Sequence, residues 1–344
     1  MKGAFKMSFF TRILTFLVSI LIGIMIFPLS PVSERAEDFR LTAYAVGNNF
    51  ADASKIDASH FEDLTDVILI SIANFNTEGE IILSQNFETI LENIKDAMKD
   101  SDANLYLNIL GPGPRINSAD WNEQMKDQSK YHNMAFESGN LEKNIKDVLV
   151  KYDFDGIFFD YEYPVTQEDW DVFDKFLISL DKYLGDDYLI GTAISAWLTM
   201  QSKEAIAVTD MVEVMAYDIW DDDGTHASMW GAEQVILKML QNGYKAKQMD
   251  MGIPFYARPT DHGAYWYGYN GYYDKLDEKG FCYDDATGLT FSFNDYDMVY
   301  EKTAWAIKKG LGGAMVWHYS CDVPKSNPKS LFNAMYNAKT DLMK

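Results

Sequence analysis

Short apolar runs alternate with longer amphipathic stretches along most of the chain, starting near Phe39. Eight of the apolar runs have the length and composition of buried strands: Arg40–Ala45, Val67–Ile72, Leu105–Leu110, Gly156–Asp160, Tyr188–Ala193, Met211–Ala216, Met249–Pro254 and Gly313–Trp317. Between most of them apolar residues recur at helical spacing, which predicts helices over Phe87–Lys99, Leu141–Val150, Asp169–Leu184, Ala232–Asn242 and Tyr296–Lys309.

Strands that alternate with helices indicate parallel pairing, because each helix carries the chain back to the same edge of the sheet. Eight such units in about 300 residues predict an α/β fold of the (β/α)8 TIM-barrel type. An open doubly wound sheet is the alternative, but no G-x-G-x-x-G follows the first strand. We therefore expect one barrel domain over residues 39–344, preceded by a separate segment over residues 1–38.

This N-terminal segment has the pattern of an export signal. Lys2, Lys6 and Arg12 precede an uncharged, mainly apolar run from Ile13 to Leu29. Positive charges before such a run direct export and hold the N-terminus inside. The run is long for a signal-peptide core and short for a spanning helix, so a cleaved signal and an uncleaved membrane anchor both stay open. We expect an exported protein, either secreted or anchored on the outer face of the membrane.

Composition limits the partners of this chain. The net charge of −22 repels phosphate backbones, so we expect no nucleic-acid partner and a neutral glycan fits better than a long anionic polymer. Cys282 and Cys321 lie too far apart for their spacing to decide whether they pair. There is no C-x-x-C and the five His are scattered, so we expect no metal site and no cofactor. We expect the protein to be a monomer.

The segment from Phe154 to Pro164, FDGIFFDYEYP, carries the clearest candidate chemistry. Residues two apart on a strand share a face, so Phe158, Asp160 and Glu162 point the same way. In a barrel that face is the interior, and Glu162 lies nearest to the C-terminal mouth, where barrel enzymes work. Two carboxylates are costly to bury without a partner or a task. The segment therefore predicts either a catalytic pair or a structural ion pair or strand-end cap.

Four motifs follow one another from Asp155 onward. The first places Asp155, Asp160 and Glu162 in the spacing D-x-x-F-x-D-x-E. The other three are VMAYD at 214–218, MGIPFYAR at 251–258 and GLGGAMVW at 310–317. Together they resemble the fourth-, sixth-, seventh- and eighth-strand motifs of glycoside hydrolase family 18, the chitinase-like family, whose fourth-strand signature is D-x-x-D-x-D-x-E.

The resemblance implies a barrel enzyme that cleaves glycans containing N-acetylglucosamine, with the acetamide of the substrate as the internal nucleophile. Glu162 would protonate the departing oxygen and later activate water. Asp160 would orient the acetamide, and Tyr217 would hold the acetamide oxygen. The remaining substrate contacts implied by the motifs are Asp155, Met215, Asp218, Tyr256 and Trp317, of which Trp317 would form the floor under the −1 sugar.

The chain departs from the family at Phe158, which stands where the signature has its second aspartate. In the family that aspartate can share a proton with the third, and Phe158 cannot. Removing a like charge lowers the pKa of Asp160, whereas desolvation by the ring raises it, and the sequence does not decide between the two effects. The turn NILGPGP at 108–114 is a second departure, because the family often has S-x-G-G there.

Several alternatives stay open. The substrate could be chitin, an N-glycan or peptidoglycan, and a barrel of this family can also keep sugar recognition after losing catalysis. Aromatic residues crowd the loop after the seventh strand, where they could stack on sugars or pack the loop against the barrel: Tyr265, Trp266, Tyr267, Tyr269, Tyr272 and Tyr273. Trp197 and Trp220, after the fifth and sixth strands, are similar candidates.

Overall fold

A computed structural model describes residues 39–197 and 199–343 of the protein. The expected export segment, residues 1–38, lies outside the described residues. Within the described ranges, no helix is long and apolar enough to cross a membrane.

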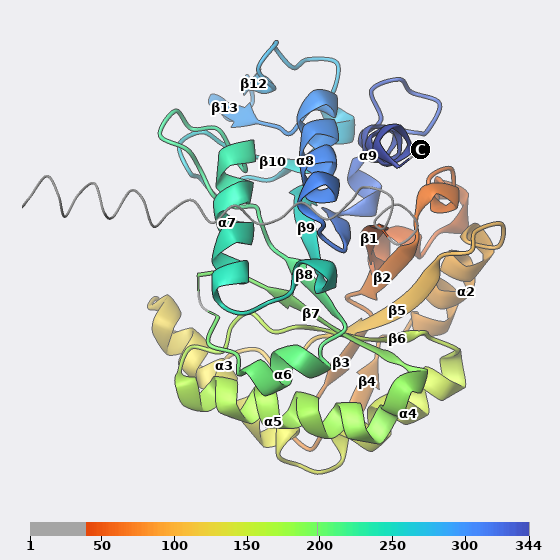
Figure 1. Ribbon diagram of the computed structural model, residues 1–344, viewed down its shortest axis with the longest axis vertical. Coiled ribbons are helices and arrows are strands. Elements are labelled where there is room, and N and C mark those ends of the chain that lie inside the picture. Colours follow the sequence, from red (N-terminus) through yellow and green to blue (C-terminus); the bar gives the residue numbers. More distant parts are fainter. Residues whose placement is uncertain (1–38, 198, 344) are drawn as a thin grey trace, which may run out of the picture.

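Eight parallel strands close into a barrel in which each strand pairs with the next one along the chain, and the last pairs with the first (Figure 1). They are β1 (Arg40–Val46), β2 (Asp66–Ile70), β5 (Asn104–Ile109), β6 (Gly156–Asp160), β7 (Leu189–Ile194), β8 (Met211–Val214), β9 (Met249–Pro254) and β14 (Gly313–Trp317). The predicted barrel and its eight strands are confirmed, each strand to within two residues at either end.

Helices surround the barrel (Figure 1). The five predicted ones are α2 (Phe87–Ala97), α4 (Leu141–Tyr152), α5 (Gln167–Leu184), α7 (Met229–Gln241) and α8 (Tyr296–Lys309). Helix α5 starts two residues before the predicted boundary because Thr166 and Asp169 form a capping box, each side chain accepting from the other's backbone N–H. Between β1 and β2 the described chain has only short 3-10 helices.

The structure also contains three α-helices that periodicity did not predict: α3 (Trp121–Phe136), α6 (Lys203–Val208) and α9 (Leu331–Leu342). The buried face of α3 includes Asp127, Ser129 and His132, so α3 lacks a continuous apolar stripe. Helix α6 is only six residues long, which is too short to establish a helical period.

A small antiparallel sheet is inserted between β9 and α8, on the C-terminal side of the barrel strands. Its strands, in spatial order, are β11 (Tyr267–Gly268), β10 (Tyr256–Pro259), β13 (Leu289–Ser292) and β12 (Phe281–Asp284). A second, two-stranded sheet joins β3 (Ala73–Phe75) and β4 (Ile81–Leu83).

The two cysteines do not form a disulfide. Cys282, in β12, and Cys321, after β14, are both buried free thiols.

The barrel interior is polar at its lower end and apolar above it. At the lower end the Arg40 guanidinium pairs with the buried Asp250 at 2.5 Å, and the Tyr106 hydroxyl donates to Asp66 at 2.9 Å. Above them lies fully buried Phe158, with its ring centroid 5.3 Å from that of Tyr106. The predicted inward orientation of Phe158 is confirmed, and this ring lies beneath the pocket described below.

Phe158 occupies space that a side chain on the neighbouring strand would need. A Cβ added to Gly191 on β7 would collide with the Phe158 ring. Gly191→Ala should therefore lower the free energy of unfolding by about 1–3 kcal/mol through overpacking. Chemical denaturation measures this loss. Gly113→Ala is the control, since its added methyl would meet open space and should change stability by less than about 0.5 kcal/mol.

If Phe158 is the neighbour that clashes, the double variant Gly191→Ala/Phe158→Leu should be more stable than the two single losses predict, because contacting sites are not additive. Strict additivity would contradict this placement of the ring.

Candidate active site

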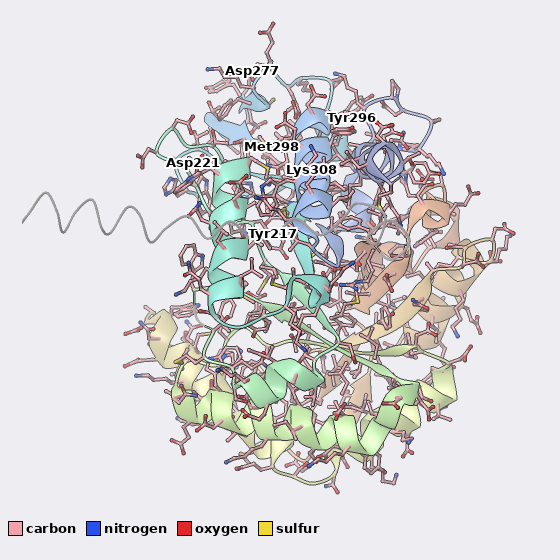
Figure 2. The ribbon with its side chains drawn as sticks, viewed as in Figure 1. Tyr217, Asp221, Asp277, Tyr296, Met298 and Lys308 are labelled. Atoms are coloured by element: carbon pink, nitrogen blue, oxygen red, sulfur yellow. The ribbon has the colours of Figure 1, made fainter. Side chains whose placement is uncertain are left out.

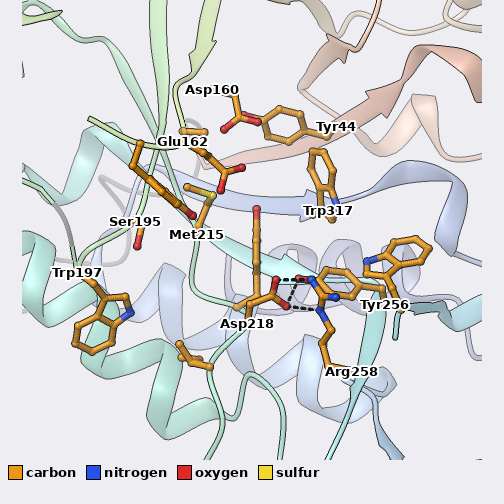
Figure 3. A pocket seen from close by; sticks show the side chains of 15 residues that line it. Tyr44, Asp160, Glu162, Ser195, Trp197, Met215, Asp218, Tyr256, Arg258 and Trp317 are labelled. Carbon is orange, nitrogen blue, oxygen red and sulfur yellow. Dashed lines mark hydrogen bonds and ion pairs between the residues drawn. The ribbon is translucent and has the colours of Figure 1, made fainter. Parts of the chain in front are cut away.

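A pocket of about 410 Å³ opens at the C-terminal ends of the barrel strands, within the range of small-molecule sites (Figure 3). Seven of the eight residues that the sequence singled out line this pocket: Asp160, Glu162, Met215, Tyr217, Asp218, Tyr256 and Trp317. They come from the ends of β6, β8, β9 and β14, or from the residues directly after those strands. Tyr217 lies near the centre of the molecule (Figure 2).

Asp155 is not part of the pocket. It directly precedes β6, at the opposite end of that strand from Asp160, and its carboxylate accepts a hydrogen bond of 2.7 Å from the backbone N–H of Leu105 on β5. This position corrects the expectation of a substrate contact. The Asp155 side chain instead satisfies a backbone donor beside the start of its own strand.

Asp160 is the last residue of β6, and its Oδ1 atom is buried without a hydrogen-bond partner among the described residues. Burial, and secondarily the charge of Glu162, raises the pKa of Asp160 to about 8. Desolvation by the surrounding protein is the larger of these two causes. Asp160 keeps its proton at neutral pH.

Glu162 follows Asp160 by two residues, and its side chain opens into the pocket. Desolvation by the surrounding protein raises the pKa of Glu162, an effect that the Tyr163 hydroxyl reduces and the charge of Asp218 reinforces. Helix α3 fixes the backbone here, because the Gln128 side-chain amide donates to the Glu162 carbonyl at 2.8 Å. The pair can thus hold a proton above neutral pH beside open space, as a general acid requires.

The pKa of Asp218 is shifted in the opposite direction from those of Asp160 and Glu162. Burial alone would raise its pKa, but hydrogen bonds with His226, Arg258 and Tyr256 outweigh burial and hold the pKa of Asp218 below its usual range. Arg258 donates to both carboxylate oxygens at 2.8–2.9 Å, and the Tyr256 hydroxyl donates at 2.7 Å (Figure 3). The pocket therefore combines two carboxyls of raised pKa, Asp160 and Glu162, with one carboxyl of lowered pKa, a division of roles typical of acid–base sites.

Aromatic rings form the walls of the pocket. The Trp317 ring lies 5.3 Å from that of Tyr44, which projects from β1 beside Asp160 (Figure 3). Trp266 stacks on Tyr256, with centroids 5.2 Å apart, and makes a similar contact with His318. Burial, followed by the charge of Asp160, raises the pKa of Tyr217 well above its usual value, so its hydroxyl remains a hydrogen-bond donor.

The two interpretations of the aromatic candidates apply to different residues. Trp197, which is 63% exposed, and Trp266 line the pocket. Tyr269 is buried, and Tyr267 stacks on Tyr272 at 4.9 Å, so these rings pack the loop. The indole of Trp220 donates to the Pro259 carbonyl and its ring stacks on His262, away from the pocket lining.

Sequence reasoning did not single out Tyr44, Tyr163, Ser195 and Arg258 as pocket residues. Arg258 ends the third motif, so its position was available as a signal. Tyr44 faces inward on a predicted strand, but nothing local distinguishes it from a packing residue. Among the described residues, no group of three His, Cys, Asp or Glu side chains could hold a metal ion.

Residues 40–322 match the sequence profile described as Glycosyl hydrolases family 18. Among curated proteins, chitinase A1 of Niallia circulans is 25% identical over 254 residues, which cover 52% of this chain and 36% of that protein.

Solved structures of similar fold include a GH18 chitinase from Cycas revoluta in complex with (GlcNAc)3, with a TM-score of 0.69 and 16% identity over 89% of this chain and 100% of that one. Another is the chitinase-like agglutinin RobpsCRA from Robinia pseudoacacia, with a TM-score of 0.67 and 18% identity over 87% of this chain and 99% of that one. At these identities the likeness concerns the fold alone.

The carboxyl pair can be tested without a substrate, by following side-chain carboxyl signals in an NMR titration. Asp160 should titrate near pH 8, far above the ordinary aspartate value of about 3.9. In Glu162→Gln its pKa should fall, since the neighbouring charge is removed, but should stay above the ordinary value because burial is the larger cause. Asp218 is the internal control and should stay ionised. An Asp160 that titrates at or below about 3.9 would contradict this account of the site.

Proposed function

The chain belongs to glycoside hydrolase family 18, and from this premise we propose that it hydrolyses β-linked glycans containing N-acetylglucosamine, as a chitinase or endo-β-N-acetylglucosaminidase. The observation that carries the proposal is the carboxyl pair of Asp160 and Glu162 at the barrel mouth, which retains a proton in a pocket walled by Tyr217 and Trp317. Glycosidic cleavage needs such an acid beside the departing oxygen.

In the proposed reaction Glu162 gives its proton to the glycosidic oxygen as the C–O bond breaks. The acetamide oxygen of the −1 sugar attacks the anomeric carbon and closes a cyclic intermediate, and no covalent bond to the protein forms. Glu162, now ionised, then takes a proton from the water that opens this intermediate. Configuration is retained because the anomeric carbon is inverted twice.

Asp160 and Tyr217 hold the acetamide in this scheme. Asp160 accepts from the acetamide N–H through one oxygen, and its proton points toward Glu162, where it stabilises the charge that appears when Glu162 loses its own proton. The Tyr217 hydroxyl donates to the acetamide oxygen. The Trp317 ring supports the apolar face of the −1 sugar.

The remaining pocket residues suit a neutral glycan. Asp218 and Arg258 offer an acceptor and donors for sugar hydroxyls, while Trp197 and Trp266 provide rings for stacking. With a net charge of −22, a neutral polymer meets less repulsion than an anionic one. This supports chitin or an N-glycan over peptidoglycan.

A second candidate function is sugar binding without turnover. Phe158 favours it, because this ring stands where the family has an aspartate. The presence of Glu162 argues against it. Turnover of a labelled N-acetylglucosamine oligomer separates the enzyme from the binding protein, and a panel of chitin, N-glycan and peptidoglycan substrates identifies the polymer.

Glu162→Gln should keep the fold and oligosaccharide binding but lower kcat about 100- to 10,000-fold, since an amide cannot transfer the proton. Steady-state kinetics on the best substrate of the panel measure this loss. Glu168→Gln, an exposed change in the first turn of α5, is the matched control and should leave kcat unchanged. Unchanged turnover in Glu162→Gln would end the assignment of the acid.

We also propose that the protein is exported, on the strength of the charged start and the apolar run from Ile13 to Leu29. Cell fractionation should find it outside the cytoplasm, either free or held in the membrane. Retention in the membrane through a high-salt wash would favour the anchor over the cleaved signal. Full-length protein free in the cytoplasm would refute the proposal.

A further inference from the structure

Helix α8 carries a lysine that is removed from water. Lys302 is fully buried, and its ammonium donates to the Ala227 carbonyl and to the Asn294 side-chain oxygen, each at 2.5 Å. Among the described residues no carboxylate lies within ion-pair distance of Lys302. The charge of Asp221, in the loop before α7, raises the pKa of Lys302 only from a longer distance (Figure 2). Burial lowers the pKa of Lys302 to about 7. A lysine side chain buried this completely, with two oxygen acceptors and no carboxylate beside it, needs a structural reason.

The partners of Lys302 lead to one short segment of chain. The Asn294 side-chain amide donates to the carbonyls of His226 and Ala227, at 3.2 and 3.3 Å. The backbone N–H of His226 donates to Ser292 Oγ at 3.0 Å. Ala227 has a φ of 49°, in the left-handed region that a residue with a side chain adopts only when its surroundings enforce it. Lys302 and Asn294 therefore fix the backbone at residues 226–227.

That segment contacts the pocket through His226. The imidazole is fully buried, and its Nε2 lies 3.1 Å from both the backbone N and the Oδ1 of Asp218. In one tautomer Nε2 accepts from the backbone, and in the other it donates to the carboxylate, so either tautomer ties the ring to Asp218. Asp218 itself has a φ of 53°, so its backbone also depends on outside support.

We propose that Lys302 is a positioning residue for the active site, acting through Asn294 and His226 to hold Asp218 in its place on the pocket wall. Tyr256 and Arg258 fix only the carboxylate of Asp218. The His226 ring also contacts the Asp218 backbone, and for this reason the buried Lys302 and Asn294, which hold His226, add support that the other two residues do not give. An apolar side chain at 302 would fill the space but could not fix two oxygen acceptors at once.

The mechanical part of the proposal is tested by amide hydrogen exchange, which requires no substrate. In Lys302→Met the Asp218 amide should exchange at least about tenfold faster, because without the Lys302 bond to the Ala227 carbonyl the segment that holds His226 against Asp218 opens more often. The Met215 amide, which donates to the Ile194 carbonyl, should be unaffected. Lys309→Met, an exposed change on the same helix, is the control. Equal rates at Asp218 in both variants and the parent protein, or equal acceleration at Asp218 and Met215, would overturn the proposal.

The functional part rests on the proposed hydrolysis and uses a double-mutant cycle with Asp218→Asn. Lys302→Met should lower kcat/KM about tenfold in the parent protein but less than about twofold in the Asp218→Asn background, because contacts in one network are not additive. An equal loss in both backgrounds would overturn the proposal. If Lys302→Met fails to fold, Asn294→Ala carries both tests. A parent protein without turnover on any substrate would refute the hydrolase function, while the exchange result would still decide the role of Lys302.

Discussion

Closing eight parallel strands into a ring leaves little water inside to solvate a charge, so every ionisable group there must be paired, neutralised or turned toward the mouth. All three outcomes occur in this barrel. Asp250 is paired with Arg40 at the lower end. Burial, followed by the charge of Asp250, raises the pKa of Glu213 well above its usual value, which favours the neutral form of this carboxyl. At the mouth the same desolvation leaves Asp160 and Glu162 with raised pKa values beside open space, where a proton can be used.

Phe158 is a packing residue at a position where the family signature has a carboxyl group. Its ring fills the space beside Gly191 and belongs to the buried apolar cluster against which Tyr217 and Trp317 also pack. With no carboxyl at position 158 to share a proton, the nearby carboxyl of Asp160 is that of Glu162, whose charge raises the pKa of Asp160 further after burial. Of the three inward positions 158, 160 and 162, where the family signature has carboxyls, this chain therefore has carboxyls at only two, Asp160 and Glu162.

Around this pair, the pocket depends on support from outside the barrel strands. Helix α3 fixes the carbonyl of Glu162 through Gln128. The small sheet after β9 provides Arg258 and Tyr256, which clamp the Asp218 carboxylate, and the loop between β10 and β11 provides Trp266, which extends the aromatic wall. These supports come from chain segments that show little periodicity. The barrel strands bring the pocket residues to the C-terminal mouth, and these supports hold them in place there.

The sequence by itself determined the barrel, its eight strands, five of its helices and the inward direction of Phe158, Asp160 and Glu162. These features follow from apolar periods of 2 and 3.6 residues and from local motifs, which short segments carry complete. The resemblance wrongly added Asp155, although the predicted strand Gly156–Asp160 already placed this residue at the opposite end of the strand from Asp160. Tertiary structure alone decided the sign of the Asp160 pKa shift, the clamp on Asp218 and its link to Lys302. Desolvation depends on which segments meet in space, and so do contacts such as that between Lys302 and Ala227, which lie 75 positions apart; no local pattern encodes either.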